Sequence, residues 1–82
     1  MVNMNIEMDL REEISRADRN WGEYHSSHEG YAVIQEELDE LWDEIKKKDT
    51  SKLLQYREAM HVACTAIRFC KMIQRNYKGV LP

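Results

Sequence analysis

The sequence has few residues that interrupt regular structure. Among its 82 residues there are one proline and three glycines. Because glycine and proline are the strongest local breakers of helices, their scarcity favours long helices. Charged residues make up 33% of the chain, a share that suits helices with a solvated face. We therefore predict an all-α protein.

Cysteine is scarce as well, with only two residues, Cys64 and Cys70. They lie six positions apart in a segment with helical periodicity, so their Cα atoms should be about 9 Å apart. This separation is too large for a disulfide. We expect both cysteines to be small buried residues of a protein from a reducing compartment.

The chain also lacks an excess of positive charge and a long apolar run. Its 12 basic residues are outnumbered by 15 acidic ones, which gives a net charge of −3 and no basic surface typical of nucleic-acid binding. No apolar run approaches the roughly 20 residues of a membrane span. The N-terminal sequence MVNMNIEMDLREE has neither the basic nor the apolar region of a secretory signal. We expect a cytoplasmic protein without nucleic-acid or membrane partners.

What the sequence does contain is apolar residues that recur every three or four positions, the period of an amphipathic helix. They predict three helices, at about residues 6–19, 28–48 and 52–77 of a single domain spanning 1–82. Ser26 and Glu29 fit a capping box before the second helix, and Thr50 or Ser51 fits an N-cap of the third. Because the connection between the second and third helices is short, these helices should pack antiparallel.

The first and second predicted helices each carry an apolar stripe. The stripes consist of Ile6, Leu10, Ile14, Ala17 and Trp21 in the first helix, and of Tyr31, Ile34, Leu38, Leu41 and Ile45, with Trp42 beside them, in the second. Both stripes should face a protein core. We expect the aromatic residues Trp21, Tyr31 and Trp42 to pack there, with stacking on a nucleotide base as the alternative.

The third predicted helix is apolar around most of its circumference. One apolar row consists of Leu53, Tyr56, Met60, Ala63, Ile67 and Cys70, and the residues roughly opposite are Leu54, Val62, Phe69 and Met72. The narrow strip that should be fully solvated contains Arg57, Arg68, Lys71 and Arg75. A helix apolar on several sides is buried among several neighbours, and so short a chain cannot supply them all. We therefore expect a homodimer or homotetramer whose antiparallel helices complete a four-helix-type bundle.

Acidic residues gather on one face of the second predicted helix. Glu37, Glu40 and Glu44 are spaced at i, i+3 and i+7, and Glu36 lies on the border of their face. Like charges at this spacing destabilise a helix unless they are neutralised. Mg²⁺ would neutralise them, because it prefers oxygen ligands. A solvated acidic face without a metal is the alternative interpretation.

Glu58 and His61 form an i, i+3 pair on the third predicted helix. They lie away from the apolar row but beside other apolar residues, where an acid needs a partner. Glu40 lies ten residues before Thr50, and Glu58 lies eight residues after it. Antiparallel packing would therefore place the pair opposite Glu37 and Glu40. This pattern suggests a metal site, whereas a structural packing role for His61 is the alternative.

These motifs resemble those of the MazG-type enzymes, which are all-α nucleoside-triphosphate pyrophosphohydrolases. Glu36-Glu37-x-x-Glu40 is followed, with seventeen residues between them, by Glu58-x-x-His61, which is similar to the E-E-x-x-E and E-x-x-D motifs of that family. The stretches HEGYAVIQEELDELWDEIKKK and REAMHVACTAIRFCKMI, within roughly residues 26–73, look like short MazG-like proteins of phages and bacteria. The resemblance implies a helical oligomer in the cytoplasm of a bacterium or an infected host cell.

The resemblance also implies an activity, the hydrolysis of a nucleoside triphosphate to a monophosphate and pyrophosphate as a form of nucleotide house-cleaning. Glu37, Glu40, Glu58 and His61 would bind the metal, Mg²⁺ or Mn²⁺. Glu36 would hold a second metal or orient the attacking water. In such a site the cation neutralises phosphate charge and activates water.

One motif position departs from the family pattern. The family has Asp where this chain has His61, and an imidazole ligand suits Mn²⁺ better than Mg²⁺. The chain is also shorter than fuller family members, which have a further helix beside the nucleotide. These two differences favour a second hypothesis, a MazG-like helical oligomer that has lost catalysis and acts as an interaction module or nucleotide sensor.

Overall fold

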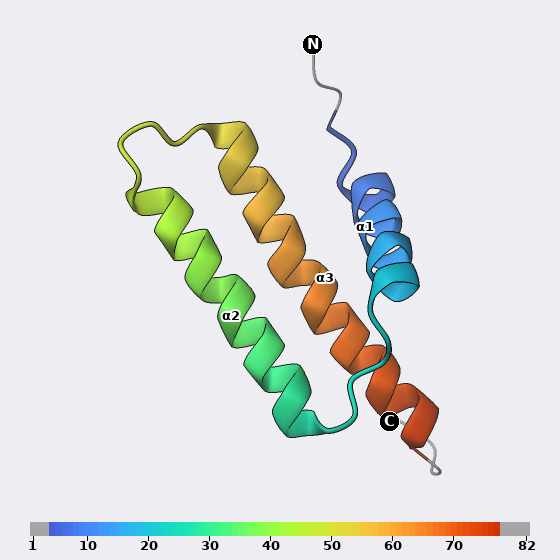
Figure 1. Cartoon of the computed structure of the whole chain (residues 1–82). Helices are drawn as coiled ribbons and strands as arrows, with labels where there is room; N and C mark the ends of the chain where they lie inside the picture. Colours follow the sequence, from blue (N-terminus) through green and yellow to red (C-terminus); the bar gives the residue numbers. More distant parts are fainter. Residues whose placement is uncertain (1–3, 78–82) are drawn as a thin grey trace.

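A computed structural model of the protein describes residues 4–77. It contains α1 (Ile6–Asn20), α2 (Ser27–Lys46) and α3 (Lys52–Asn76) (Figure 1). The described part of the chain contains no strand, so the all-α prediction is confirmed. Each helix begins and ends within two residues of its predicted bounds. The first three and last five residues of the predicted domain lie outside the described part of the chain.

A polar side chain caps the start of each helix. Side-chain oxygens of Asn5, Ser26 and Ser51 accept a hydrogen bond from the backbone N–H three residues later, which satisfies one of the unpaired donors of the first turn. Of the two hydrogen bonds of the predicted capping box, the structure shows the one accepted by Ser26. The Glu29 carboxylate instead lies 3.0 Å from Nδ1 of His25 and links the helix to the loop before it.

The helix α3 lies at the centre of the arrangement. Within residues 4–77, α1 and α2 each pack against α3 and not against one another, and they lie on either side of it (Figure 1). The helix α2 is antiparallel to α3, as predicted, whereas α1 runs in the same direction as α3. Both neighbours therefore present side chains to α3.

Arg68 of α3 fastens the connection between α1 and α2. Its guanidinium donates to the Asp18 carboxylate at 3.0 Å and to the backbone carbonyls of Trp21 and Gly22 at 3.1 and 2.7 Å. It also lies 5.2 Å from the centre of the Tyr24 ring. Arg68 is only 7% exposed, so its predicted solvated position is wrong. The connection folds over this side of α3 and supplies enough acceptors to bury the charge.

Close packing at the start of α2 requires a glycine. A Cβ atom at Gly30 would lie 2.5 Å from the Phe69 ring and 2.9 Å from the Tyr24 ring. Neither ring is the end of a flexible chain, so α2 could approach α3 this closely only without a side chain at this position.

The protein core is small, and much apolar surface stays exposed. The α2 residues Tyr31, Leu38, Trp42 and Ile45 are 43–66% exposed, and Trp21 is 68% exposed. The expectation that the aromatic residues pack in the core is therefore wrong within one chain, because no helix among residues 4–77 covers this side of α2. Cys64 is buried, as expected, but Cys70 is exposed, and both are free thiols. None of the three helices is long and apolar enough to cross a membrane.

Candidate metal centre

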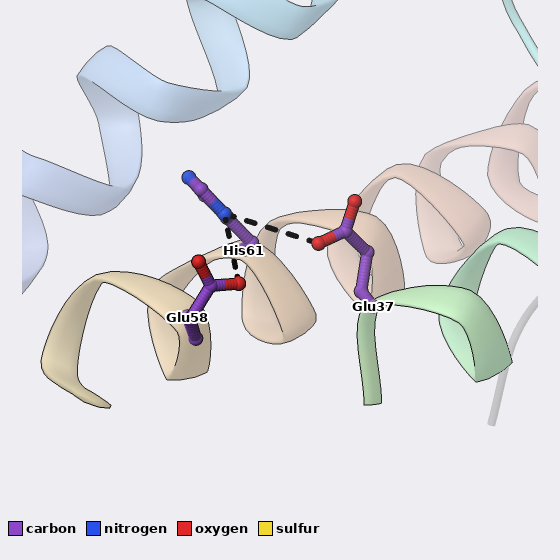
Figure 2. Close-up of side chains that lie close together, drawn as sticks. All are labelled: Glu37, Glu58 and His61. Atoms are coloured by element: carbon purple, nitrogen blue, oxygen red, sulfur yellow. Dashed lines mark ion pairs between the residues drawn. The ribbon is translucent and has the colours of Figure 1, made fainter. Parts of the chain in front are cut away.

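Antiparallel packing of α2 against α3 brings together side chains that are distant in the sequence. Glu37 extends from α2 toward Glu58 and His61, which lie one turn apart on α3 (Figure 2). The His61 Nδ1 atom lies 3.8 Å from Glu37 Oε2 and 3.7 Å from Glu58 Oε2. One ligand atom of each residue lies within 4.8 Å of the other two. Such a spacing is compatible with all three side chains binding one ion.

Burial leaves this cluster with unmet hydrogen-bonding capacity. The side chains of Glu37 and Glu58 are 24% and 26% exposed, but the Oε2 atom of each is shielded from solvent. Neither atom accepts a hydrogen bond from the residues that the structure describes. A buried acceptor without a partner is rare in folded proteins, because it loses its bonds to water. Two such oxygens beside an imidazole are a donor set that fits a divalent cation.

The pKa of Glu37 reflects the same burial. The pKa of Glu37 is raised from 4.5 to about 7, first by burial and then by charge repulsion and a hydrogen bond with the Glu40 carboxylate. Glu58 contributes to this rise, whereas His61 opposes it. Near neutral pH, Glu37 therefore binds a proton in a substantial fraction of the molecules. A cation that binds there must displace that proton.

Glu13 of α1 is a further member of the cluster that the sequence analysis missed. Its Oε1 atom lies 3.4 Å from the second ring nitrogen of His61, Nε2. Arg16 forms an ion pair with the same carboxylate. A signal was present, because Glu13 lies between Leu10 and Ala17 on the apolar stripe of its helix. An acid in such a place needs a partner, as argued above for Glu58 alone.

The other predicted acids take separate positions. Glu36 and Glu40 are exposed, although Glu40 lies close enough to Glu37 to shift its pKa. Glu44 is buried and pairs through Oε1 with Lys47 at 3.5 Å, while its Oε2 atom also accepts no hydrogen bond from the described residues. It lies outside the group that could hold an ion. The predicted acidic face is thus divided, and of its three residues only the first, Glu37, joins Glu58 and His61.

A cavity of about 550 Å³ lies beside the cluster. Residues from all three helices and from the α1–α2 connection line it, and Glu36, Glu37 and His61 are among them. Trp21 and Arg16 also line this cavity. Its volume falls within the range of small-molecule sites, about 300–1,000 Å³. The exposed ring of Trp21 therefore borders a space large enough for an organic ligand.

Comparisons with protein-family models, curated proteins and solved structures find no significant match to this chain. The resemblance to MazG-type enzymes, which rests on the motif residues and their spacing, therefore stays a prediction. The geometry brings Glu37, Glu58 and His61 together, with Glu40 beside Glu37. Their roles as metal ligands, and the role of Glu36, stay predictions.

Proposed function

We propose that the protein is a metal-dependent hydrolase that converts a nucleoside triphosphate to a monophosphate and pyrophosphate. One observation carries this proposal. Glu37, Glu58 and His61 converge from two helices, with two buried oxygens that accept no hydrogen bond from residues 4–77, at the edge of a cavity of about 550 Å³. The motif resemblance of the sequence supports the choice of a nucleotide as ligand.

Each residue of the cluster has a role in the proposed reaction. Glu37, Glu58 and His61, with Glu40 beside them, hold a divalent cation, Mg²⁺ or Mn²⁺. Such a cation neutralises phosphate charge and activates water. Glu36 lines the same cavity and accepts a proton from the attacking water. The water oxygen bonds to the α-phosphorus while the bond to the bridging oxygen breaks, and pyrophosphate leaves with that oxygen.

Self-association is part of the proposal. The exposed residues Tyr31, Leu38, Trp42 and Ile45 follow one another along α2 at helical spacing. An apolar row of this kind on a small chain is typical of an interaction surface. We propose that a second copy covers it, in a homodimer or homotetramer. Light scattering at micromolar concentration tests this, and a stable particle of 9.8 kDa would contradict it.

The activity is tested by the products formed from a panel of ribonucleoside and deoxyribonucleoside triphosphates with Mg²⁺ or Mn²⁺. We expect pyrophosphate and a monophosphate rather than inorganic phosphate. Glu37→Gln should abolish their formation, whereas Asp43→Asn, which changes an exposed acid of the same helix, should not. Glu36→Gln should lower turnover about 10²–10⁴-fold with metal affinity unchanged. Failure of every triphosphate with both metals would contradict the proposal.

A second candidate function is a non-catalytic helical oligomer that binds nucleotides as a sensor or acts as an interaction module. The observation that favours it is the position of His61, within 3.8 Å of carboxylate oxygens from Glu13, Glu37 and Glu58. In this arrangement the imidazole itself bridges the three carboxylates, in the place that a metal would otherwise take. Nucleotide binding without product formation, at the same protein concentration, would support this candidate.

A further inference from the structure

Both ring nitrogens of His61 face carboxylates, and these carboxylates come from three different helices. Nδ1 faces Glu37 of α2 and Glu58 of α3, where the two buried oxygens lie. Nε2 faces Glu13 of α1, at 3.4 Å from its Oε1 atom. The ring therefore spans the space between α1 and the proposed metal position, with one nitrogen directed to each side (Figure 2).

Two interactions between α1 and α3, one before Glu13 in the sequence and one after it, fix the position of Glu13 relative to α3. Before it on α1, the Asp9 carboxylate accepts a hydrogen bond of 2.6 Å from the Tyr56 hydroxyl. After it, Asp18 accepts one of 3.0 Å from Arg68. Both pairs join α1 to α3, so together they prevent α1 from sliding along its neighbour. Glu13 lies between these two fastened points and is held where His61 can reach it.

The Glu13 side chain is also oriented within its own helix. Arg16 lies one turn later, and its Nε atom donates to Glu13 Oε2 at 3.3 Å. The Nη2 atom of Arg16 also donates to Oε1, the oxygen that faces the His61 ring, so Arg16 holds the carboxylate by both oxygens and shares Oε1 with His61. The carboxylate is 19% exposed, so water competes only weakly for it. A carboxylate placed in this way is a strong acceptor for a ring N–H.

We propose that Glu13 is a positioning residue that accepts the Nε2–H of His61 and so directs the lone pair of Nδ1 toward a divalent cation held by Glu37 and Glu58. This inference rests on the proposed metal site, but it does not depend on hydrolysis. Metal-binding histidines generally donate their other ring N–H to a carboxylate or carbonyl, which fixes both the tautomer and the ring orientation. The helix α1 thereby becomes part of the site without supplying a ligand.

The test measures Mn²⁺ affinity by calorimetry for the full-length chain and its variants. Glu13→Ala should weaken binding about 10–100-fold, the usual effect of losing such a partner. Glu13→Gln should keep most of the affinity, because its amide oxygen accepts the same hydrogen bond. Glu12→Ala removes one negative charge from the adjacent exposed position, so it measures the effect of charge alone and should leave the affinity nearly unchanged.

A second readout follows the ring itself. In the metal-free protein, NMR should show a His61 Nε2–H resonance protected from solvent exchange in the wild type and in Glu13→Gln, but not in Glu13→Ala. Glu13→Asp keeps the charge and withdraws the oxygen by one methylene, so it should also lose the protected signal. This variant serves if Glu13→Ala does not fold.

The outcomes separate this inference from the proposed function. If the wild type does not bind Mn²⁺, the metal site is wrong and this inference falls with it. If the wild type binds Mn²⁺ and Glu13→Ala and Glu13→Asp bind it equally well, the inference alone is wrong. Equal weakening in Glu12→Ala and Glu13→Ala would assign the effect to net charge and would also overturn the positioning role.

Discussion

Two groups of charged side chains on α3, seven residues apart, solve the problem of burial in opposite ways. At Arg68, one buried cation is surrounded by acceptors, namely the Asp18 carboxylate and the carbonyls of Trp21 and Gly22. At His61, one imidazole is surrounded by carboxylates, and two buried oxygens accept no hydrogen bond from residues 4–77. We call the group at Arg68 saturated, because its charge is fully paired, and the group at His61 unsaturated, because two of its acceptors are not. A saturated group stabilises a fold, whereas an unsaturated one is typical of a site that binds a ligand.

The acids of the two groups show the difference in the direction of their pKa shifts. Burial alone would raise the pKa of Asp18, but hydrogen bonds from Arg68 and Lys71 outweigh it and lower the pKa. Burial and the neighbouring carboxylates together raise the pKa of Glu37 to about 7, and the nearby imidazole opposes this only in part. The first acid is stabilised in its charged form by the protein itself. The second requires a proton or a cation.

The largest effect should follow from breaking the saturated group. Arg68→Met would leave two backbone carbonyls without their donor and Asp18 with Lys71 alone, so we expect a loss of about 3 kcal/mol in the free energy of unfolding. Urea denaturation measures this loss. Arg75→Met is the matched control, because the ion pair of Arg75 with Glu23 is about half exposed and should contribute less than about 1 kcal/mol. Equal losses in the two variants would contradict the structural role of Arg68.

The two groups also differ in how far the sequence predicts them. Helical periodicity predicts the three helices, and the spacing of Glu37, Glu58 and His61 around one short turn predicts their meeting. The role of Arg68 is not predictable in this way. Its partners lie 46–50 residues away, and two of them are backbone carbonyls that carry no sequence signal. The position of α1 on α3, and hence the part played by Glu13, depends on the same long-range contacts.

A divalent metal should stabilise the unsaturated group and leave the saturated one unaffected. A ligand that binds only the folded state at a hundredfold excess over its Kd adds about 2.7 kcal/mol. We therefore expect Mn²⁺ or Mg²⁺ to raise the melting temperature measured by calorimetry, relative to protein in a chelator. Glu58→Gln should abolish this rise, and Asp18→Asn should keep it at a lower starting stability. An unchanged melting temperature of the wild type in millimolar metal would contradict a metal site.

In a chelator, the two groups should respond differently to pH. Because the pKa of Glu37 is about 7 in the folded protein against an ordinary 4.5, the folded state binds its proton more tightly between these values. The metal-free protein should therefore lose stability as pH rises from about 4.5 to about 7. The loss is on the order of 2 kcal/mol, since each pKa unit corresponds to about 1.4 kcal/mol and solvent screens part of the shift.

Urea denaturation at pH 5 and pH 7.5 measures this dependence. His61, Glu58 and Glu40 all influence the pKa of Glu37, so the difference between the wild type and Glu37→Gln isolates the contribution of Glu37. Asp18→Asn should lower stability equally at both pH values, because the lowered pKa of Asp18 places its own titration below 3.8. A wild type and a Glu37→Gln variant with the same pH dependence would be inconsistent with a strained Glu37.

The smallest expected effect is a change in metal preference, and it depends on His61, the imidazole among the carboxylates of the unsaturated group. His61→Asp replaces the central imidazole by a carboxylate, which Mg²⁺ prefers as a ligand, whereas imidazole favours Mn²⁺. We expect the ratio of Mg²⁺ to Mn²⁺ affinity to rise about tenfold, which corresponds to about 1.4 kcal/mol. The metal-free variant should be less stable than the wild type, because a further like charge then lies beside Glu37 and Glu58. His28→Asp, at an exposed histidine, is the control and should leave the metal preference unchanged. If His61→Asp lowers stability without changing the metal preference, His61 is a packing residue rather than a ligand. Its group would then stabilise the fold, as the group at Arg68 does, and would not be a binding site.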